Sequence, residues 1–154
     1  MTKKEKIAAF DPSGECANHG LFGLPFSADE SEVILIPVPW EASVSFRTGT
    51  SRAPESIRQA SRQVDLYDPF LPDGWKNGYF LLEEEGKLAE KSAAAQMQIE
   101  SQRIAETEQG SDSAHKVDLL CADMIEQVRQ TSRNWLDRSK IVAVLGGDHS
   151  TPLG

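Results

Sequence analysis

The sequence predicts an α/β fold built on a parallel sheet, and three observations lead to this prediction. Two short apolar runs, residues 33–38 and 140–145, show the continuous hydrophobicity typical of strands that are buried on both faces. The long stretch between them contains helical patterns, so it can form the crossover that a parallel pair of strands requires. The chain has 154 residues, which is an ordinary length for one domain.

Composition and charge narrow the possible classes of function. The sequence carries 16 Lys and Arg against 24 Asp and Glu, a net charge of −8. It therefore lacks the basic surface by which proteins bind nucleic acids or anionic membranes, and a cationic small molecule suits it better. Because no apolar run is long enough to cross a bilayer and the start lacks a secretory signal, we expect a cytoplasmic protein without membrane or nucleic-acid partners.

The two cysteines and two of the histidines do not form a recognisable site. Cys16 and Cys121 form no CxxC motif, so we interpret them as reduced thiols. His19 lies in a turn-like segment, and His115 follows a polar stretch. Neither histidine has further metal ligands at a regular spacing, so we interpret His19 as a turn residue and His115 as a solvated one.

The pattern along the chain divides it into an arm and a domain. Residues 1–32 are rich in Gly, Pro, Ser and Asp and show no sustained periodicity, which predicts an irregular N-terminal arm. Residues 33–154 carry the strands and helices of the domain. Within it, residues 83–110 are polar with a thin apolar face, and we interpret them as a surface insertion that is helical or partly disordered.

The first part of the domain has the order strand, loop, helix. We expect the strand at residues 33–38 to end at Pro37 and Pro39, since proline cannot donate to a strand ladder. Residues 40–52 mix Ser, Thr, Gly and Arg and should form a loop at the carboxyl end of this strand. Pro54 suits the first turn of the helix that follows.

The second part has a short strand, a long helix and the second apolar strand. Residues 79–82 predict the short strand. The long helix should start near residues 111–113, and its apolar side chains repeat at helical spacing: Val117, Leu120, Cys121, Met124, Ile125 and Val128. Such a stripe most simply covers a face of the sheet.

The motif Gly146-Gly147-Asp148-His149-Ser150 directly follows the second apolar strand. Two glycines at this point allow a sharp turn and a close approach of other groups. The carboxyl edge of a parallel sheet is where α/β folds bind ligands. His149 is a candidate metal ligand, and Asp148 is a candidate to orient its imidazole. A structural interpretation stays open here, in which Asp148 and His149 cap the next helix.

This motif and a second segment resemble the ureohydrolase family, which includes arginase, agmatinase, guanidinobutyrase and guanidine hydrolase. The second segment is similar to the agmatinase-like branch and consists of Val38-Pro39-Trp40, Ser45-Phe46-Arg47-Thr48-Gly49-Thr50, Ala53-Pro54 and Ile57-Arg58. The two segments stand in the family's order, and each follows a predicted strand as it does in the family. This agreement favours the functional interpretation of His149 over the structural one.

The resemblance implies a three-layer α/β/α sandwich with a mainly parallel sheet, of which this chain would form the N-terminal portion. It also implies two divalent ions, usually Mn²⁺ with Ni²⁺ as the alternative, whose bridging water supplies a hydroxide that attacks the guanidinium carbon. His149 would be the first metal ligand in chain order. The expected substrate is agmatine, guanidine or a related cationic guanidino compound, cleaved to urea and an amine or ammonia by a homo-oligomer, a trimer or hexamer.

The sequence also departs from the family. The family's further ligands, in an Asp-x-His-x-Asp and an Asp-x-Asp motif, are absent from residues 1–154, so we expect a truncated chain. One histidine cannot hold two ions. Two alternatives to a catalytic parent therefore stay open: a non-catalytic remnant or partner-dependent subunit, and a single-metal or ligand-binding module with a coincidental motif.

Two further features bear on specificity. The polar stretch at residues 83–110 resembles the guanidine-hydrolase and guanidinobutyrase-like branch more than compact agmatinase. Trp40 and Phe46 flank the first loop, where they would either line a small pocket or pack at a subunit interface.

Overall fold

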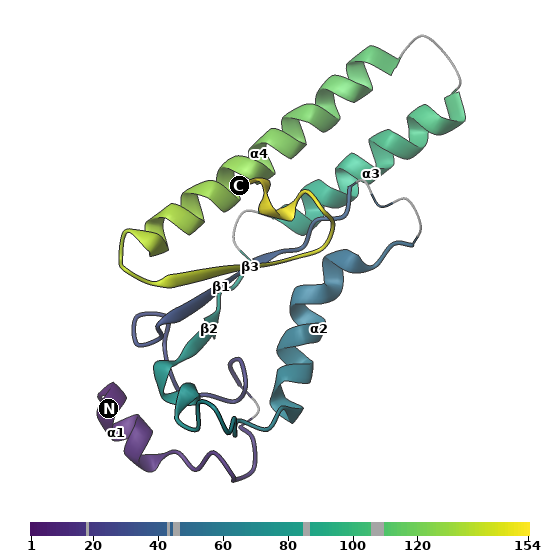
Figure 1. Ribbon diagram of the computed structural model, residues 1–154. Helices are drawn as coiled ribbons and strands as arrows, with labels where there is room; N and C mark the ends of the chain where they lie inside the picture. The colour runs from purple at the N-terminus through teal and green to yellow at the C-terminus, as the bar shows by residue number, and fades with distance from the viewer. Residues whose placement is uncertain (18, 43, 45–46, 85–86, 106–109) are drawn as a thin grey trace.

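The computed structural model describes residues 1–154 except 18, 43, 45–46, 85–86 and 106–109, and of residues 102, 104, 105 and 110–112 it describes the backbone alone. At its centre is a parallel sheet of three strands in the order β2-β1-β3 (Figure 1). The strands are β1 (Val33–Val38), β2 (Tyr79–Leu81) and β3 (Ile141–Gly146). The prediction of an α/β fold with a parallel sheet is confirmed.

Helices occupy both sides of this sheet. A long pair, α3 and α4, covers one face, while α2 lies on the other side and α1 stands apart near the N-terminus (Figure 1). The helices are α1 (Lys3–Ala9), α2 (Ala53–Ala60), α3 (Leu88–Ala105) and α4 (Gly110–Leu136). Short 3-10 helices connect the main elements: η1 (Thr50–Arg52), η2 (Ser61–Gln63), η3 (Gly74–Asn77) and η4 (Thr151–Leu153).

The main core lies between the sheet and the α3–α4 pair. Ile36 and Val38 point from β1 toward this pair, because alternate residues of a strand share a face. From α4, Met124 and Val128 meet them and are 0% and 1% exposed. Around this cluster pack Leu120, Cys121 and Ile125. The predicted apolar stripe of the long helix therefore covers a sheet face, as expected.

The polar stretch at residues 83–110 contributes more to the core than its composition indicates. Helix α3 begins at Leu88 within this stretch, and Leu88 and Ala95 are 5% and 0% exposed. Both belong to the main core cluster with α4 and β1. The helical prediction is confirmed for residues 88–105. The thin apolar face of this helix is sufficient for packing, because small alanine side chains let α3 approach its neighbours closely.

Pro37 lies inside β1 and does not end the strand, so that expectation was wrong. Its Cα partner in β3 is Leu145. The Val33 amide donates to the Gly78 carbonyl, and the Leu35 carbonyl accepts from the Leu82 amide. The backbone amides and carbonyls of the odd-numbered residues of β1 therefore point toward the β2 side. The β1–β2 register ends at Leu35. Proline is therefore tolerated at position 37, where β2 no longer requires a donor.

The expectation that β3 is buried on both faces was also wrong for the part of the chain that the structure describes. Ile141 and Val144 are 62% and 38% exposed. The reason is topological: β3 pairs with β1 along one edge, and its second edge has no strand partner among the described residues. An apolar run thus predicted a strand without predicting what covers it.

The N-terminal arm is more ordered than predicted. Residues 1–32 contain helix α1, which starts with a capping box in which Thr2 accepts from the Glu5 amide and the Glu5 side chain accepts from the Thr2 amide. Leu24 and Phe26 are buried against Trp75. The Thr-x-x-Glu signal was present in the sequence, so the irregular arm was a wrong interpretation of residues 2–9.

None of the described helices is both long enough and apolar enough to span a membrane.

Candidate functional site

The carboxyl ends of β1 and β3 lie side by side, and their register pairs Val38 with Gly146. The loop that follows β1 and the glycine motif that follows β3 are therefore neighbours. A backbone hydrogen bond joins them, because the amide of Asp148 donates to the carbonyl of Trp40 at 2.9 Å. The structure thus brings together the two segments that carry the family resemblance.

The two glycines of the motif are required by close contacts. A Cβ on Gly147 would lie 2.0 Å from the carbonyl oxygen of Trp40 and 3.3 Å from the amide nitrogen of Ser51. A Cβ on Gly146 would lie 2.1 Å from the hydroxyl oxygen of Thr151. No side chain fits at such distances, so the close approach expected from the sequence is confirmed.

The two candidate site residues have different environments. His149 is exposed at the turn after β3, whereas Asp148 is partly buried. The Asp148 carboxylate accepts from the backbone amide of Ser150 at 2.9 Å and from the Ser150 hydroxyl, so it stabilises the turn that leads into η4. A role of Asp148 in orienting His149, and of His149 as a metal ligand, stays a prediction.

A two-ion centre needs more ligands than these. Within the described ranges, no group of three or more His, Cys, Asp or Glu side chains is arranged to hold a metal ion. His149 is thus a single candidate ligand, and one imidazole does not fit two bridged ions. The described residues therefore do not by themselves fit the metal centre that the resemblance implies.

Glu41 is the residue at this edge that the sequence analysis missed. It is 8% exposed, and one of its oxygens, Oε2, accepts from the amide of Gly49 at 2.6 Å, the amide of Ser51 at 3.0 Å and the hydroxyl of Thr50 at 3.1 Å. Burial alone would raise the pKa of this carboxyl, but the hydrogen bonds from Ser51, Gly49 and Thr50 outweigh it, so the pKa lies below its usual value.

Helix α3 holds the main chain of Glu41 from the other side. The Glu41 amide donates to the hydroxyl of Ser92 at 2.8 Å, and the Gln96 side chain donates to the Glu41 carbonyl at 2.8 Å. Ser92 is 2% exposed. A polar, buried connection therefore runs from the middle of α3 to the loop beside the glycine motif.

The remaining sequence candidates lie in ordinary positions. Trp40 is 1% exposed and packs in the main core, rather than lining a pocket or lying on an exposed interface. Phe46 lies outside the described residues. His19 and His115 are exposed. Cys16 and Cys121 are free thiols, and burial, with the negative charges of Asp118 and Asp148, raises the pKa of the Cys121 thiol.

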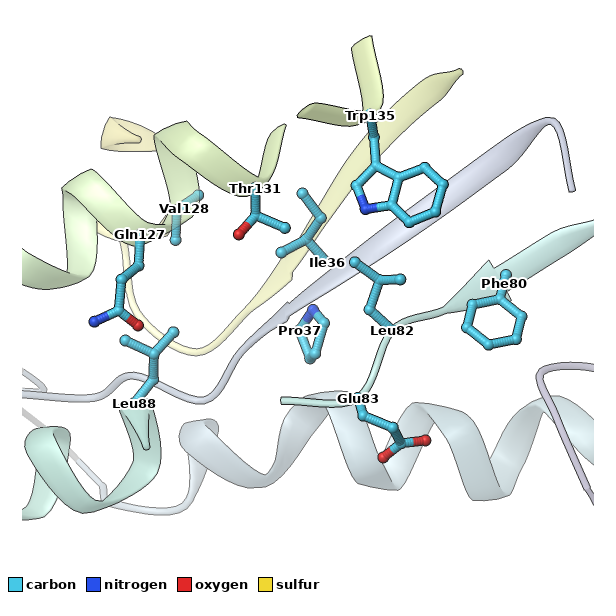
Figure 2. Close-up of a pocket in the computed structure, with 10 residues that line it drawn as sticks. All are labelled: Ile36, Pro37, Phe80, Leu82, Glu83, Leu88, Gln127, Val128, Thr131 and Trp135. Carbon is cyan, nitrogen blue, oxygen red and sulfur yellow. The ribbon is translucent and has the colours of Figure 1, made fainter. Parts of the chain in front are cut away.

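A separate cavity of about 350 Å³ lies between the sheet and α4. Figure 2 shows Ile36, Leu82 and Trp135 around it, with Gln127 near Leu88 and Glu83 below Leu82. Its lining includes no residue of the glycine motif, and Ile36, Leu88 and Val128 of this lining belong to the main core cluster. This cavity is therefore not the site to which the motif points.

Comparison with known proteins supports the family resemblance of the two segments that meet at the carboxyl edge. The model of the arginase family matches residues 31–154, which include both segments of the resemblance. A relative named N(1)-aminopropylagmatine ureohydrolase, from one strain of Thermus thermophilus, is 31% identical over 126 residues, covering 79% of this chain and 32% of the relative. No solved structure matches the chain.

Two further relatives carry the same name and match shorter segments. The protein from Synechocystis sp. is 38% identical over 42 residues, which are 27% of this chain and 14% of that protein. The protein from a second strain of Thermus thermophilus is 44% identical over 43 residues, 28% of this chain and 14% of its own length. The chain thus spans a third or less of these relatives. Because the family model covers all three strands of the sheet and the edge where the two loops meet, this chain belongs to the arginase family.

Proposed function

We propose that the full-length protein containing this chain hydrolyses the guanidinium C–N bond of a small guanidino compound. One observation carries the proposal: in a chain of the arginase family, the Gly-Gly-Asp-His turn is docked on the loop after β1 at the carboxyl edge of the sheet. Hydrolysis of a guanidino compound such as agmatine gives urea and an amine, and hydrolysis of guanidine gives urea and ammonia. The relatives' name supports the same chemical class.

The metal requirement is part of this proposal. His149 would supply one ligand to a divalent ion, with Mn²⁺ as the first candidate and Ni²⁺ as the alternative. The further ligands would come from residues of the full-length protein other than those described here, since His149 is a single candidate ligand within the described ranges. When bound, the ions would supply a hydroxide near neutral pH. Asp148 would keep the turn around His149 in place through its contacts with Ser150.

The absence of a ligand cluster within the described residues favours a second candidate for the 154-residue chain itself. By itself the chain would be non-catalytic, or would act as a subunit that needs intact partners. We expect no urea release from the purified chain with Mn²⁺ or Ni²⁺ added. For the full-length protein we propose a cytoplasmic homo-oligomer, and the net charge of −8 favours a cationic small-molecule substrate over nucleic acid.

The decisive experiment replaces His149 in the full-length protein. His149→Ala should lower bound metal per subunit and reduce turnover by at least about 100-fold, because a metal ligand affects both quantities together. Metal content would be measured by mass spectrometry and turnover by urea release from agmatine, guanidine and aminopropylagmatine. His115→Ala is the matched control, since His115 is an exposed histidine on α4. Unchanged metal content and turnover in His149→Ala would contradict the proposal.

A further inference from the structure

We propose that Glu41 is a positioning residue, whose buried carboxylate holds residues 49–51 against the Gly147 turn and so fixes the segment that carries His149. This role rests on the proposed function for its kinetic consequence. Its structural part concerns the chain alone and can be tested without any activity.

The carboxylate of Glu41 binds a sharply turned segment of the loop, residues 49–51. A single oxygen accepts three donors from three consecutive residues, Gly49, Thr50 and Ser51. Gly49 has a φ of +118°, a conformation that other residues rarely adopt, so the chain turns sharply at this point. A buried anionic acceptor compensates for the two amides that this path turns inward.

The residues that Glu41 binds also contact the glycine motif. The Ser51 amide that donates to Glu41 lies beside Gly147, at 3.3 Å from the position a Cβ would take there. The Trp40 carbonyl oxygen lies closer still to that Cβ position of Gly147, and it accepts a hydrogen bond from the Asp148 amide. Gly147 is therefore enclosed by the residue before Glu41 and by a residue that Glu41 binds.

Helix α3 supports Glu41 from behind. The amide and carbonyl of Glu41 are bound by Ser92 and Gln96 of α3, so its backbone is held from a different element than its side chain. A displaced carboxylate could not be compensated by a small shift of the main chain. The polar stretch that the sequence predicts as a surface insertion thus acts on the candidate site through Glu41.

The experiment combines hydrogen exchange with kinetics in the full-length protein. Glu41→Ala should accelerate amide exchange at least about 10-fold both in residues 47–52 and in residues 146–151, because the first segment loses its acceptor and the second loses its support. It should also lower kcat at least about 10-fold while global helicity is retained. Glu41→Gln keeps an acceptor oxygen but loses the charge, so its effects on exchange and on kcat should be smaller than those of Glu41→Ala.

Asp68→Asn is the matched control, since Asp68 also accepts from a backbone amide, that of Phe70, in another loop. It should change neither the exchange of the two segments nor kcat. Should Glu41→Ala fail to fold, Ser92→Ala provides the second variant, with faster exchange expected in the same two segments.

Failure of the positioning role and failure of the proposed function give different results. Faster exchange confined to residues 47–52, with residues 146–151 unchanged, would overturn the positioning role. So would an unchanged kcat and KM in Glu41→Ala of an active protein. If the wild-type protein releases no urea from any guanidino compound, the proposed function fails. The positioning role of Glu41 is then still tested by comparing amide exchange in residues 146–151 between Glu41→Ala and the wild type.

Discussion

The two loops at the carboxyl edge of the sheet are held in place in different ways. In the loop after β1, Trp40 and Glu41 are buried; α3 binds the backbone of Glu41, and amides of the same loop bind its carboxylate. The turn after β3 is partly or fully exposed at residues 147–150. Its contacts include a backbone bond to Trp40 and the bonds between Asp148 and Ser150.

Of the two loops, the one after β1 is the more firmly held, and the turn with His149 is bonded to it. The candidate ligand His149 lies on the less buried segment, which is joined to the loop after β1 by the bond from the Asp148 amide to the Trp40 carbonyl. Gly147 and Glu41 have no direct chemical role, but both are expected to affect the site through the backbone that they hold in place. Such support is required because a binding site works only within a narrow range of geometry.

The largest effect is expected from a clash between the two loops. Gly147→Ala places a Cβ 2.0 Å from the Trp40 carbonyl oxygen, so the backbone of one loop must move. We expect the free energy of unfolding to fall by more than about 3 kcal/mol. Urea unfolding followed by tryptophan fluorescence measures this change.

Gly14→Ala is the control for this prediction, because Gly14 is exposed and the nearest atom to an added Cβ is 3.3 Å away. A loss below about 1 kcal/mol is expected there. An equally small loss in Gly147→Ala would show that the two loops are not packed as closely as described.

The next effect concerns the charge of Glu41. Its pKa is lowered in the folded protein from the ordinary value of 4.5, so its ionised form stabilises the fold above that pH and the contribution is lost as the pH falls through the lowered value. Glu41→Gln should cost about 1–2 kcal/mol at pH 7. The difference from the wild type should shrink below pH 4.5, and urea unfolding across that range measures it. A difference that stays constant with pH would contradict the charge argument.

A smaller effect is expected from the exposed turn. Asp148→Ala removes the acceptor for the Ser150 amide and should cost about 1 kcal/mol, measured by thermal unfolding. Asp11→Ala is a matched control, since Asp11 accepts from the Ser13 amide at 2.9 Å in an exposed turn of the arm. Equal losses at the two positions would mean that the carboxyl edge gives Asp148 no special environment.

The smallest effect on the site is expected from a charged contact far from it. Glu30 accepts from Lys6 at 2.6 Å and from the amide and hydroxyl of Ser27, and these bonds lower its pKa to about 2. Glu30→Gln should cost about 1 kcal/mol at pH 7, a difference that disappears between pH 4.5 and 2 as the wild-type carboxylate is protonated. Urea unfolding at several pH values measures it.

The exchange of residues 47–52 and 146–151 should not change in Glu30→Gln. A change in those segments would show that the arm and the carboxyl edge are coupled, against their separation in the fold.

Sequence patterns predicted the elements of the fold well where the signal is local. The continuous apolar runs identified β1 and β3, and the helical spacing from Leu120 to Val128 identified the core face of α4. The pair of glycines located the close approach at Gly147. Each of these signals follows from the residues of a single segment.

The missed features depend on partners elsewhere in the chain. Glu41 is one acidic residue in a polar loop, and its backbone amide is bound by Ser92, 51 residues away in α3. Pro37 is tolerated because β2 ends opposite Leu35, and the exposure of β3 depends on what pairs with its second edge. A single segment cannot reveal such relations.

The parallel order of the strands has a consequence for how the chain folds. The contact of Lys140 with the carbonyl of Ser31, beside the start of β1, closes a separation of 109 residues. Loops of this length close slowly compared with helices, so α3 and α4 should pair before β1 meets β3. During synthesis on the ribosome, β1 would be without β3 until residues 141–146 have emerged. The apolar strand Val33–Val38 is therefore open to aggregation during this interval.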